Sequence, residues 1–267
     1  MLRDITIGQF FPGNSFVHRV DPRVKLVLVI AMIIALFFAG GVVSYLLIAT
    51  YELIVIWVSR IHFKMVVRGL KPILFIIIFT AILNLFYTPG DVLWAWHFLH
   101  ITKQGIFMAI QMVARIMLLI IGTSMLTYTT SPIDLTDALE RLLSPLKRLR
   151  VPVHELAMIM SIALRFIPTL IEETEKIISA QRARGADFES GNIIQRARAM
   201  VPILVPLFIS AFRRADELAT AMECRLYHGG EGRTRLKQLH ICWIDYLAIF
   251  ISALIFGTVI VLGRLGW

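Results

Sequence analysis

The sequence predicts an all-α integral membrane protein with about five transmembrane helices and one long cytoplasmic helical segment. Hydrophobic residues fill 58% of the 267 positions, and the mean hydropathy is +0.76, which is typical of a membrane-embedded chain. The formal net charge is nevertheless +9. The lysines and arginines must therefore gather in blocks outside the apolar segments, and these blocks predict the orientation.

Five apolar segments approach the roughly 20 residues that a helix needs to cross the hydrocarbon core of a bilayer. They are Val24–Ala39, Val42–Val58, Pro72–Tyr87, Gly105–Tyr128 and Trp243–Leu262. Gly40-Gly41 alone separates the first two segments, which predicts a tight hairpin. Residues 1–22 are mixed and polar, and they do not form the apolar core of a signal peptide.

The basic residues predict a cytoplasmic N-terminus and an external C-terminus. Three of them precede the first span and Lys25 lies at its start, four follow the second span, and most of the others lie between residues 129 and 240. The loops on the opposite side hold only Lys103 and Arg264. An excess of lysine and arginine marks cytoplasmic loops, so all the basic blocks are placed inside.

Two further apolar stretches, Val153–Ile171 and Met200–Phe212, are interpreted as helix starts packed under the bilayer. Reading both as spans would export a basic segment that contains Arg182 and Arg184, against the charge rule. The first stretch also contains Arg165, and the second is short and contains two prolines.

The sequence thus divides into residues 1–128 with the first four spans, a cytoplasmic domain at 129–240, and residues 241–267 with the fifth span. Three helices are expected in the cytoplasmic domain, at about 131–150, 153–184 and 199–228. Ser131-Pro132 provides an N-cap and a proline at the first helical position, and Gly185 suits a left-handed C-cap.

One short pattern occurs twice, at the C-terminal ends of the two long helices. Residues 179–185 read SAQRARG, and residues 220–226 read TAMECRL. The charged residues that accompany the two tips are Glu175, Arg182, Asp216 and Glu223. An arginine in a last helical turn gains about 0.3–1 kcal/mol from the helix dipole, so each tip alone could be a plain cap. The repetition favours docking instead, with Arg184 and Arg225 binding carboxylates of a partner.

Two ionisable residues, Glu52 and Arg115, lie within predicted spans, where such residues are functional candidates. Their expected depths differ by about one helical turn, so a structural pair is one interpretation. Snorkelling or a polar cavity is a second interpretation, and substrate contact is a third. The two cysteines, Cys224 and Cys242, show neither disulfide nor metal-site spacing, and no metal site is expected.

The two tips resemble the paired Ala-Arg-Gly motifs of the transmembrane T component of energy-coupling factor (ECF) transporters. Ala183-Arg184-Gly185 matches the first motif in full, and Cys224-Arg225-Leu226 keeps the arginine of the second. Ile7–Phe10 and His18–Leu26 are similar to the N-terminal signature of that family, and Ser131–Pro152 to its first coupling helix. The resemblance covers essentially the whole chain.

The resemblance implies a non-catalytic coupling subunit of a vitamin or micronutrient importer in a bacterial or archaeal cytoplasmic membrane. It implies two ABC-type ATPases and a small substrate-binding membrane protein, the S component, as partners, and no nucleic acid. The second and third coupling helices would cross and dock in the ATPases, which would bind ATP and Mg²⁺, whereas this chain would bind no cofactor.

Two other functions stay open at this point. A stand-alone secondary transporter would show repeated bundles and broken helices near the membrane midplane. A membrane-embedded enzyme would need titratable side chains clustered at one membrane depth.

Overall fold

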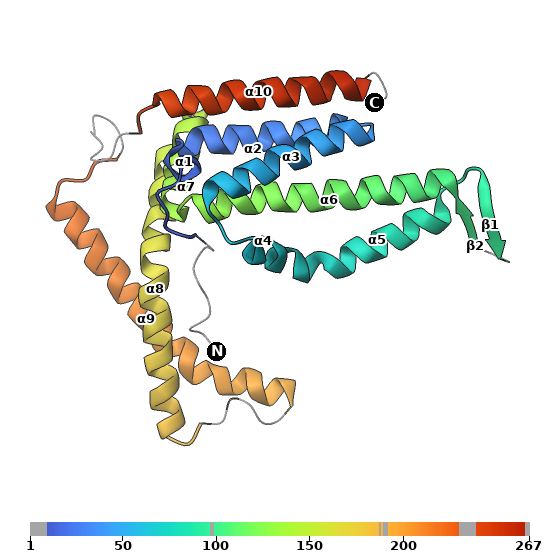
Figure 1. Ribbon diagram of the computed structural model, residues 1–267. Coiled ribbons are helices and arrows are strands. Elements are labelled where there is room, and N and C mark those ends of the chain that lie inside the picture. The colour runs from blue at the N-terminus through green and yellow to red at the C-terminus, as the bar shows by residue number, and fades with distance from the viewer. Residues whose placement is uncertain (1–9, 97–98, 187, 189–191, 230–238, 265–267) are drawn as a thin grey trace. The chain divides into compact units, whose positions relative to one another are not determined.

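The computed structural model describes residues 10–96, 99–186, 188, 192–229 and 239–264, so Ile7 to Gln9 of the N-terminal signature lie outside the described residues. The described chain forms two compact units (Figure 1). The bundle unit lies within residues 8–138 and 237–267, and the hairpin unit comprises described residues within 139–236.

The bundle unit contains helices near all five predicted spans. Its elements are α1 (Phe16–Arg19), α2 (Pro22–Phe38), α3 (Val42–Ser59), α4 (Phe63–Leu70), α5 (Leu74–Tyr87), β1 (Val92–Trp96), β2 (Leu99–Thr102), α6 (Lys103–Thr129) and α10 (Trp243–Arg264). The basic loop expected after the second span is itself helical, because α4 and a 3-10 turn at Lys71–Ile73 lead directly into α5. The short antiparallel hairpin of β1 and β2 is a departure from the all-α prediction.

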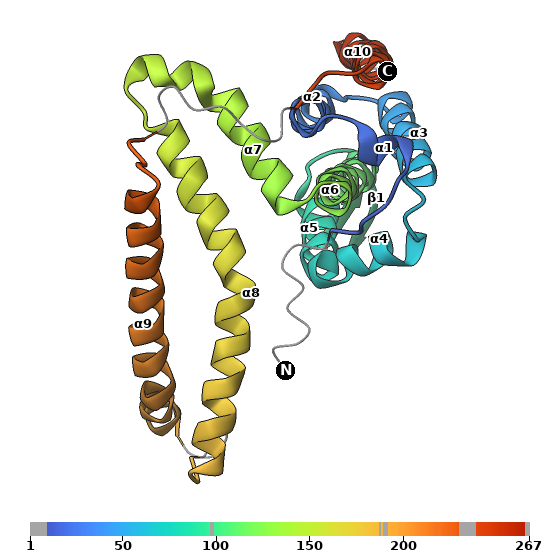
Figure 2. The ribbon, with the colours of Figure 1, turned by 90° about the vertical axis from the view of Figure 1, so that its left-hand side faces the viewer.

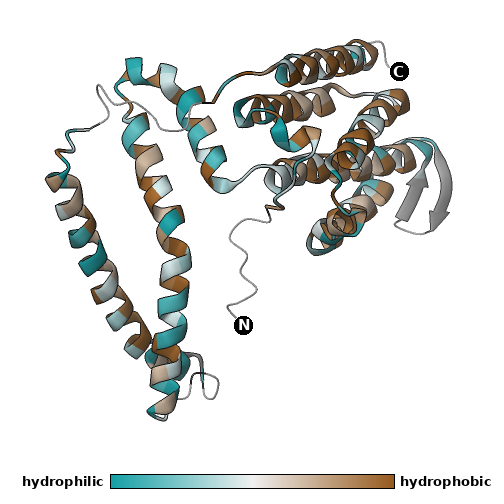
Figure 3. Ribbon diagram, turned by 60° about the vertical axis from the view of Figure 1, so that its left-hand side comes forward, coloured by the Kyte–Doolittle hydropathy of each residue, from teal (hydrophilic) through white to brown (hydrophobic). Residues whose placement is uncertain are grey.

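The core of the bundle unit forms where α2, α3, α6 and α10 pack together. Leu36, Ile48 and Val259 are fully buried there, and Leu118 of α6 joins the same cluster. Much of the remaining apolar surface is exposed, as at Trp57 of α3, and the helices are hydrophobic along most of their length (Figure 3). This pattern is typical of helices that face lipid rather than water.

The hairpin unit consists mainly of two long helices, α8 (Val153–Ala183) and α9 (Ile193–Cys224). They lie side by side with opposite directions and cross one another (Figures 1 and 2). They are preceded by α7 (Pro132–Leu143), which begins within the bundle unit, and by a 3-10 helix at Ser144–Leu149. The predicted cap of α7 is present, because the Asp134 amide donates to Ser131 Oγ at 3.1 Å.

The predicted bounds of the third cytoplasmic helix, 199–228, are wrong at both ends. Its start lies earlier because the Asn192 amide donates to Gln195 Oε1 at 3.1 Å, half of a capping box that begins α9 at Ile193. The helix then continues through Pro202 and Pro206 and stops at Cys224.

Six helices of the described chain are long and apolar enough to cross a membrane: α3, the continuous run Phe63–Tyr87, α6, α8, α9 and α10. The prediction of about five spans differs from this set, because α8 and α9 qualify by length and composition, whereas α2 has only 17 residues. The chain is therefore a multi-pass, predominantly helical membrane protein.

Candidate functional site

The first tip is a C-terminal cap at the end of α8. The Gly185 amide donates to the Arg182 carbonyl at 3.0 Å, and the Ala186 amide donates to the Gln181 carbonyl at 3.0 Å. Gly185 has φ +87°, in the left-handed region. This bonding pattern is a Schellman motif, which turns the chain sharply after Arg184.

The second tip repeats this geometry at the end of α9. The Leu226 amide donates to the Glu223 carbonyl at 2.9 Å, and the Tyr227 amide donates to the Met222 carbonyl at 3.1 Å. Leu226 has φ +53°, so it adopts the left-handed conformation in the position that Gly185 occupies in the first tip. The helix predicted to reach residue 228 ends at Cys224 instead, because Leu226 adopts the left-handed conformation that reverses the chain. Its side chain is 78% exposed.

The likeness of the two tips extends one turn upstream. Ser179 Oγ donates to the Glu175 carbonyl, and Thr220 Oγ1 donates to the Asp216 carbonyl, both at 2.8 Å. The sequence repeat therefore corresponds to a repeated backbone structure of about two helical turns.

Both tip arginines are exposed. Among the described residues, neither Arg184 nor Arg225 has a side-chain hydrogen bond or ion pair. The adjoining small residues, Ala183 and Cys224, are exposed as well. Each guanidinium is therefore available for a bidentate contact with a carboxylate outside this chain.

The other charged residues named for the tips have different environments. Arg182, Asp216 and Glu223 are exposed, whereas Glu175 is half-buried. Among the described residues, none of the three carboxylates forms an ion pair with Arg184 or Arg225.

An ionic brace joins α8 and α9, and sequence reasoning did not identify it. The Glu173 carboxylate accepts from Arg214 Nη2 at 3.0 Å, from Arg214 Nε at 3.3 Å and from the Ser210 hydroxyl. Opposite charges in the two long helices were a signal for it, but the pairing depends on the register of the hairpin.

The possible polar pair of Glu52 and Arg115 is not formed. Arg115 instead donates to the Tyr45 hydroxyl at 2.7 and 3.1 Å and to the Ala39 carbonyl at 3.3 Å. Glu52 lies beside Gly122 of α6. That residue is seven positions from Arg115, about 10 Å along a helix. The depth estimate from the sequence was therefore too small for this pair.

The N-terminal signature residues hold the start of α2 against α10. Asp245 is 1% exposed and accepts from the amides of Asp21 and Cys242, both at 2.7 Å. Asp21 in turn pairs with Arg23 at 2.7 Å. The His18–Leu26 segment therefore has a structural role in the bundle unit.

Known proteins are similar to this chain in sequence along most of its length. The family model described as CbiQ, cobalt transport protein, matches residues 13–236. A protein of Ruminiclostridium cellulolyticum is 57% identical over 262 residues, covering 98% of each chain. A protein of Clostridium kluyveri is 53% identical over 269 residues, covering 100% of this chain and 99% of its own. One of Bacillus subtilis is 48% identical over 240 residues, covering 90% and 91%.

All three relatives carry the name energy-coupling factor transporter transmembrane protein EcfT. The matches extend over both long helices and both arginine tips, so the likeness is not confined to the spans. The chain therefore belongs to the CbiQ family and is the non-catalytic transmembrane component, EcfT, of an energy-coupling factor transporter.

Proposed function

We propose that this subunit couples two cytoplasmic ABC-type ATPases to a small substrate-binding membrane protein, the S component, during uptake of a vitamin or another micronutrient. The names of the relatives support an energy-coupling factor complex. ATP and Mg²⁺ bind to the ATPases in this proposal, and this chain holds neither.

The observation that carries the proposal is the pair of matching tips. Two exposed arginines, Arg184 and Arg225, each follow the last turn of a long helix, and the same capping bonds fix both chain reversals. A repeated structure suits two similar docking grooves, one in each ATPase. The site comprises Ala183-Arg184-Gly185 and Cys224-Arg225-Leu226, with a carboxylate of each groove as the expected partner.

The proposed topology has five spans, α2, α3, α5, α6 and α10, with the N-terminus in the cytoplasm and the C-terminus outside. Residues 129–240, which include α7, α8 and α9, then form the cytoplasmic coupling domain. The many charged residues of α8 and α9 support this placement, since Figure 3 shows both helices mixing polar and apolar residues along their length. Keeping them inside also places their arginines in the cytoplasm, as the charge rule requires.

In the proposed mechanism, closure of the ATPase dimer displaces the two tips. Because α8 and α9 are long and joined by the brace of Glu173 with Ser210 and Arg214, displacement of the tips moves the crossed pair as a body. The exposed apolar residues in the first half of each helix, such as Ile159 and Phe208, then transmit the motion to the S component.

The test is a mild-detergent pull-down of the tagged chain with its native partners. Arg184→Glu and Arg225→Glu, singly and together, should lose the ATPases while the chain still inserts in the membrane. Arg213→Glu is the matched control, because Arg213 is exposed on α9 but lies away from both tips. Retention of both ATPases by the double variant, with normal uptake, would refute the assignment. Uptake that persists without any ATPase would favour a stand-alone secondary transporter.

A further inference from the structure

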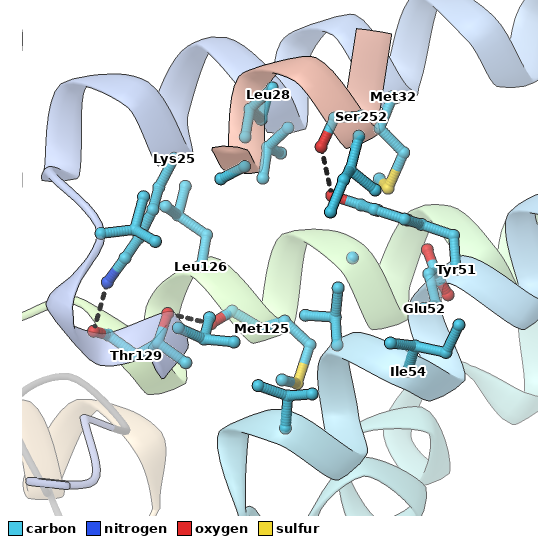
Figure 4. A pocket seen from close by; sticks show the side chains of 18 of the residues that line it. Lys25, Leu28, Met32, Tyr51, Glu52, Ile54, Met125, Leu126, Thr129 and Ser252 are labelled. Carbon is cyan, nitrogen blue, oxygen red and sulfur yellow. Dashed lines mark hydrogen bonds between the residues drawn. The ribbon is translucent and has the colours of Figure 1, made fainter. Parts of the chain in front are cut away.

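A cavity of about 260 Å³ lies within the bundle unit, between α1, α2, α3, α6 and α10 (Figure 4). Its wall is almost entirely apolar, with Met32, Val55, Met125 and Ile251 among the lining residues. The volume is slightly below the roughly 300–1,000 Å³ typical of small-molecule pockets, whereas the apolar composition of the wall is typical of them.

One polar group in this wall has no partner. Glu52 is 4% exposed, and neither of its carboxyl oxygens has a hydrogen-bond donor among the described residues. Buried polar groups in proteins are nearly always hydrogen-bonded, because leaving one unpaired is costly. An unpaired carboxyl in a cavity wall therefore indicates that a donor from outside the chain completes it.

The Glu52 carboxyl lies close to Gly122 of α6 and to the end of the Met32 side chain. A Cβ atom at Gly122 would lie 2.6 Å from Met32 Sδ and 2.9 Å from Glu52 Oε1. A larger residue at this point of α6 would displace the end of the Met32 or Glu52 side chain. Glu52 and Met32 therefore meet at Gly122, and both residues line the cavity.

The other polar groups near the cavity are already bound. Lys25 Nζ donates to the Thr129 carbonyl at 2.9 Å, and the Tyr51 and Ser252 hydroxyls are 2.9 Å apart (Figure 4). Lys25 lies on one side of the view and Glu52 on the other, so no lining cation reaches the carboxyl. A ligand would find mainly apolar walls, with Glu52 as a carboxyl that has no hydrogen-bond donor among the described residues.

We propose that this cavity binds a small membrane-dissolved amphiphile whose hydroxyl or ammonium group donates a hydrogen bond to Glu52. The apolar part of the ligand then fills the space along Met32, Val55 and Met125. Access is from the lipid phase, because Glu52 lies near the middle of α3, one of the helices long and apolar enough to span a membrane. The inference does not depend on the arginine tips or on the coupling function.

The test uses photolabelling of the full chain in lipid nanodiscs with an octanol that carries a diazirine. The same diazirine on octane, without the hydroxyl, is the matched probe. The expected result is an adduct on cavity residues that 1-octanol displaces and octane does not. Octylamine as a second competitor distinguishes an ammonium ligand from a hydroxyl ligand.

Substitutions of residues in the cavity wall complete the photolabelling experiment. Glu52→Leu should reduce labelling about tenfold, the loss expected for one buried hydrogen bond, and Glu52→Gln should keep most of it. Val55→Phe fills the cavity and should abolish labelling without touching the carboxyl, which keeps the test valid if Glu52→Leu does not fold. Ile82→Phe, on the exposed surface of α5, is the control.

Two results would overturn the proposal. One is equal labelling of the wild type and the Val55→Phe variant. The other is adducts spread over lipid-facing residues with no difference between the octanol and octane probes.

Discussion

At equivalent positions of the two helix tips, introducing glycine and removing glycine should change the local stability in opposite directions. Leu226 and Gly185 both adopt positive φ, at +53° and +87°. The left-handed conformation costs a residue with a Cβ roughly 1–2 kcal/mol, whereas glycine loses more conformational entropy on folding, which costs roughly 0.5–1 kcal/mol. Leu226→Gly should therefore stabilise its tip by about 0.5–1 kcal/mol, since a side chain that is 78% exposed loses little burial.

Gly185→Ala should do the reverse at the other tip. No atom lies within 4 Å of a Cβ built on Gly185, so the cost comes from φ alone and not from a clash. We expect a loss of about 0.5–1 kcal/mol. Gly257→Ala is the matched control, because Gly257 lies inside α10, also has open space, and has no positive φ. That variant should leave both tips unchanged.

Hydrogen exchange on the full chain measures both effects locally. The amides that close the caps belong to Tyr227 and Ala186. A change of 0.5–1 kcal/mol corresponds to roughly a two- to fivefold change in local opening, slower at Tyr227 in Leu226→Gly and faster at Ala186 in Gly185→Ala. Shifts of the same sign at both tips, or none at either, would show that φ does not control these caps.

Two further predictions concern buried and interhelical polar contacts. Asp245→Ala leaves two backbone amides without an acceptor and should lower the free energy of unfolding by about 2–4 kcal/mol. Asp245→Asn keeps one side-chain oxygen as an acceptor, so it should be destabilised less when both variants are unfolded thermally in detergent. Equal losses of stability in the two variants would contradict this account. Arg214→Glu places a second carboxylate beside Glu173, and the repulsion should increase hydrogen exchange along α8 and α9. The charge swap Glu173→Arg/Arg214→Glu should restore protection if the brace depends on charge alone.

Much of the fold follows from patterns that act over short distances. The apolar runs predicted helices near all five expected spans, and Ser131-Pro132 predicted the start of α7, because a helix cap involves only neighbouring residues. The two arginine tips were found in the same way. A repeated seven-residue pattern corresponds to a repeated set of capping bonds.

The predictions that differ from the structure involve either a helix cap or contacts between residues that are distant in sequence. Asn192 and Gln195 form part of a capping box that is visible in the sequence, and α9 begins there, well before Pro202 and Pro206. The separation of Glu52 from Arg115 could not be read from the sequence, because relative depth depends on how α3 packs against α6. The register of α8 against α9, which brings Glu173 to Arg214, is equally a property of the packed pair.

The departure of the second tip from Ala-Arg-Gly shows which part of the motif carries its geometry. Strain at a left-handed residue persists only where neighbouring interactions fix the conformation, and here two capping bonds do so after Arg225. Glycine makes that turn cheaper, but the backbone of the second tip reaches it with leucine. The arginine has no such substitute, because no other side chain combines a permanent charge with a planar fork of donors. Loss of the arginine should therefore disrupt docking far more than loss of the glycine.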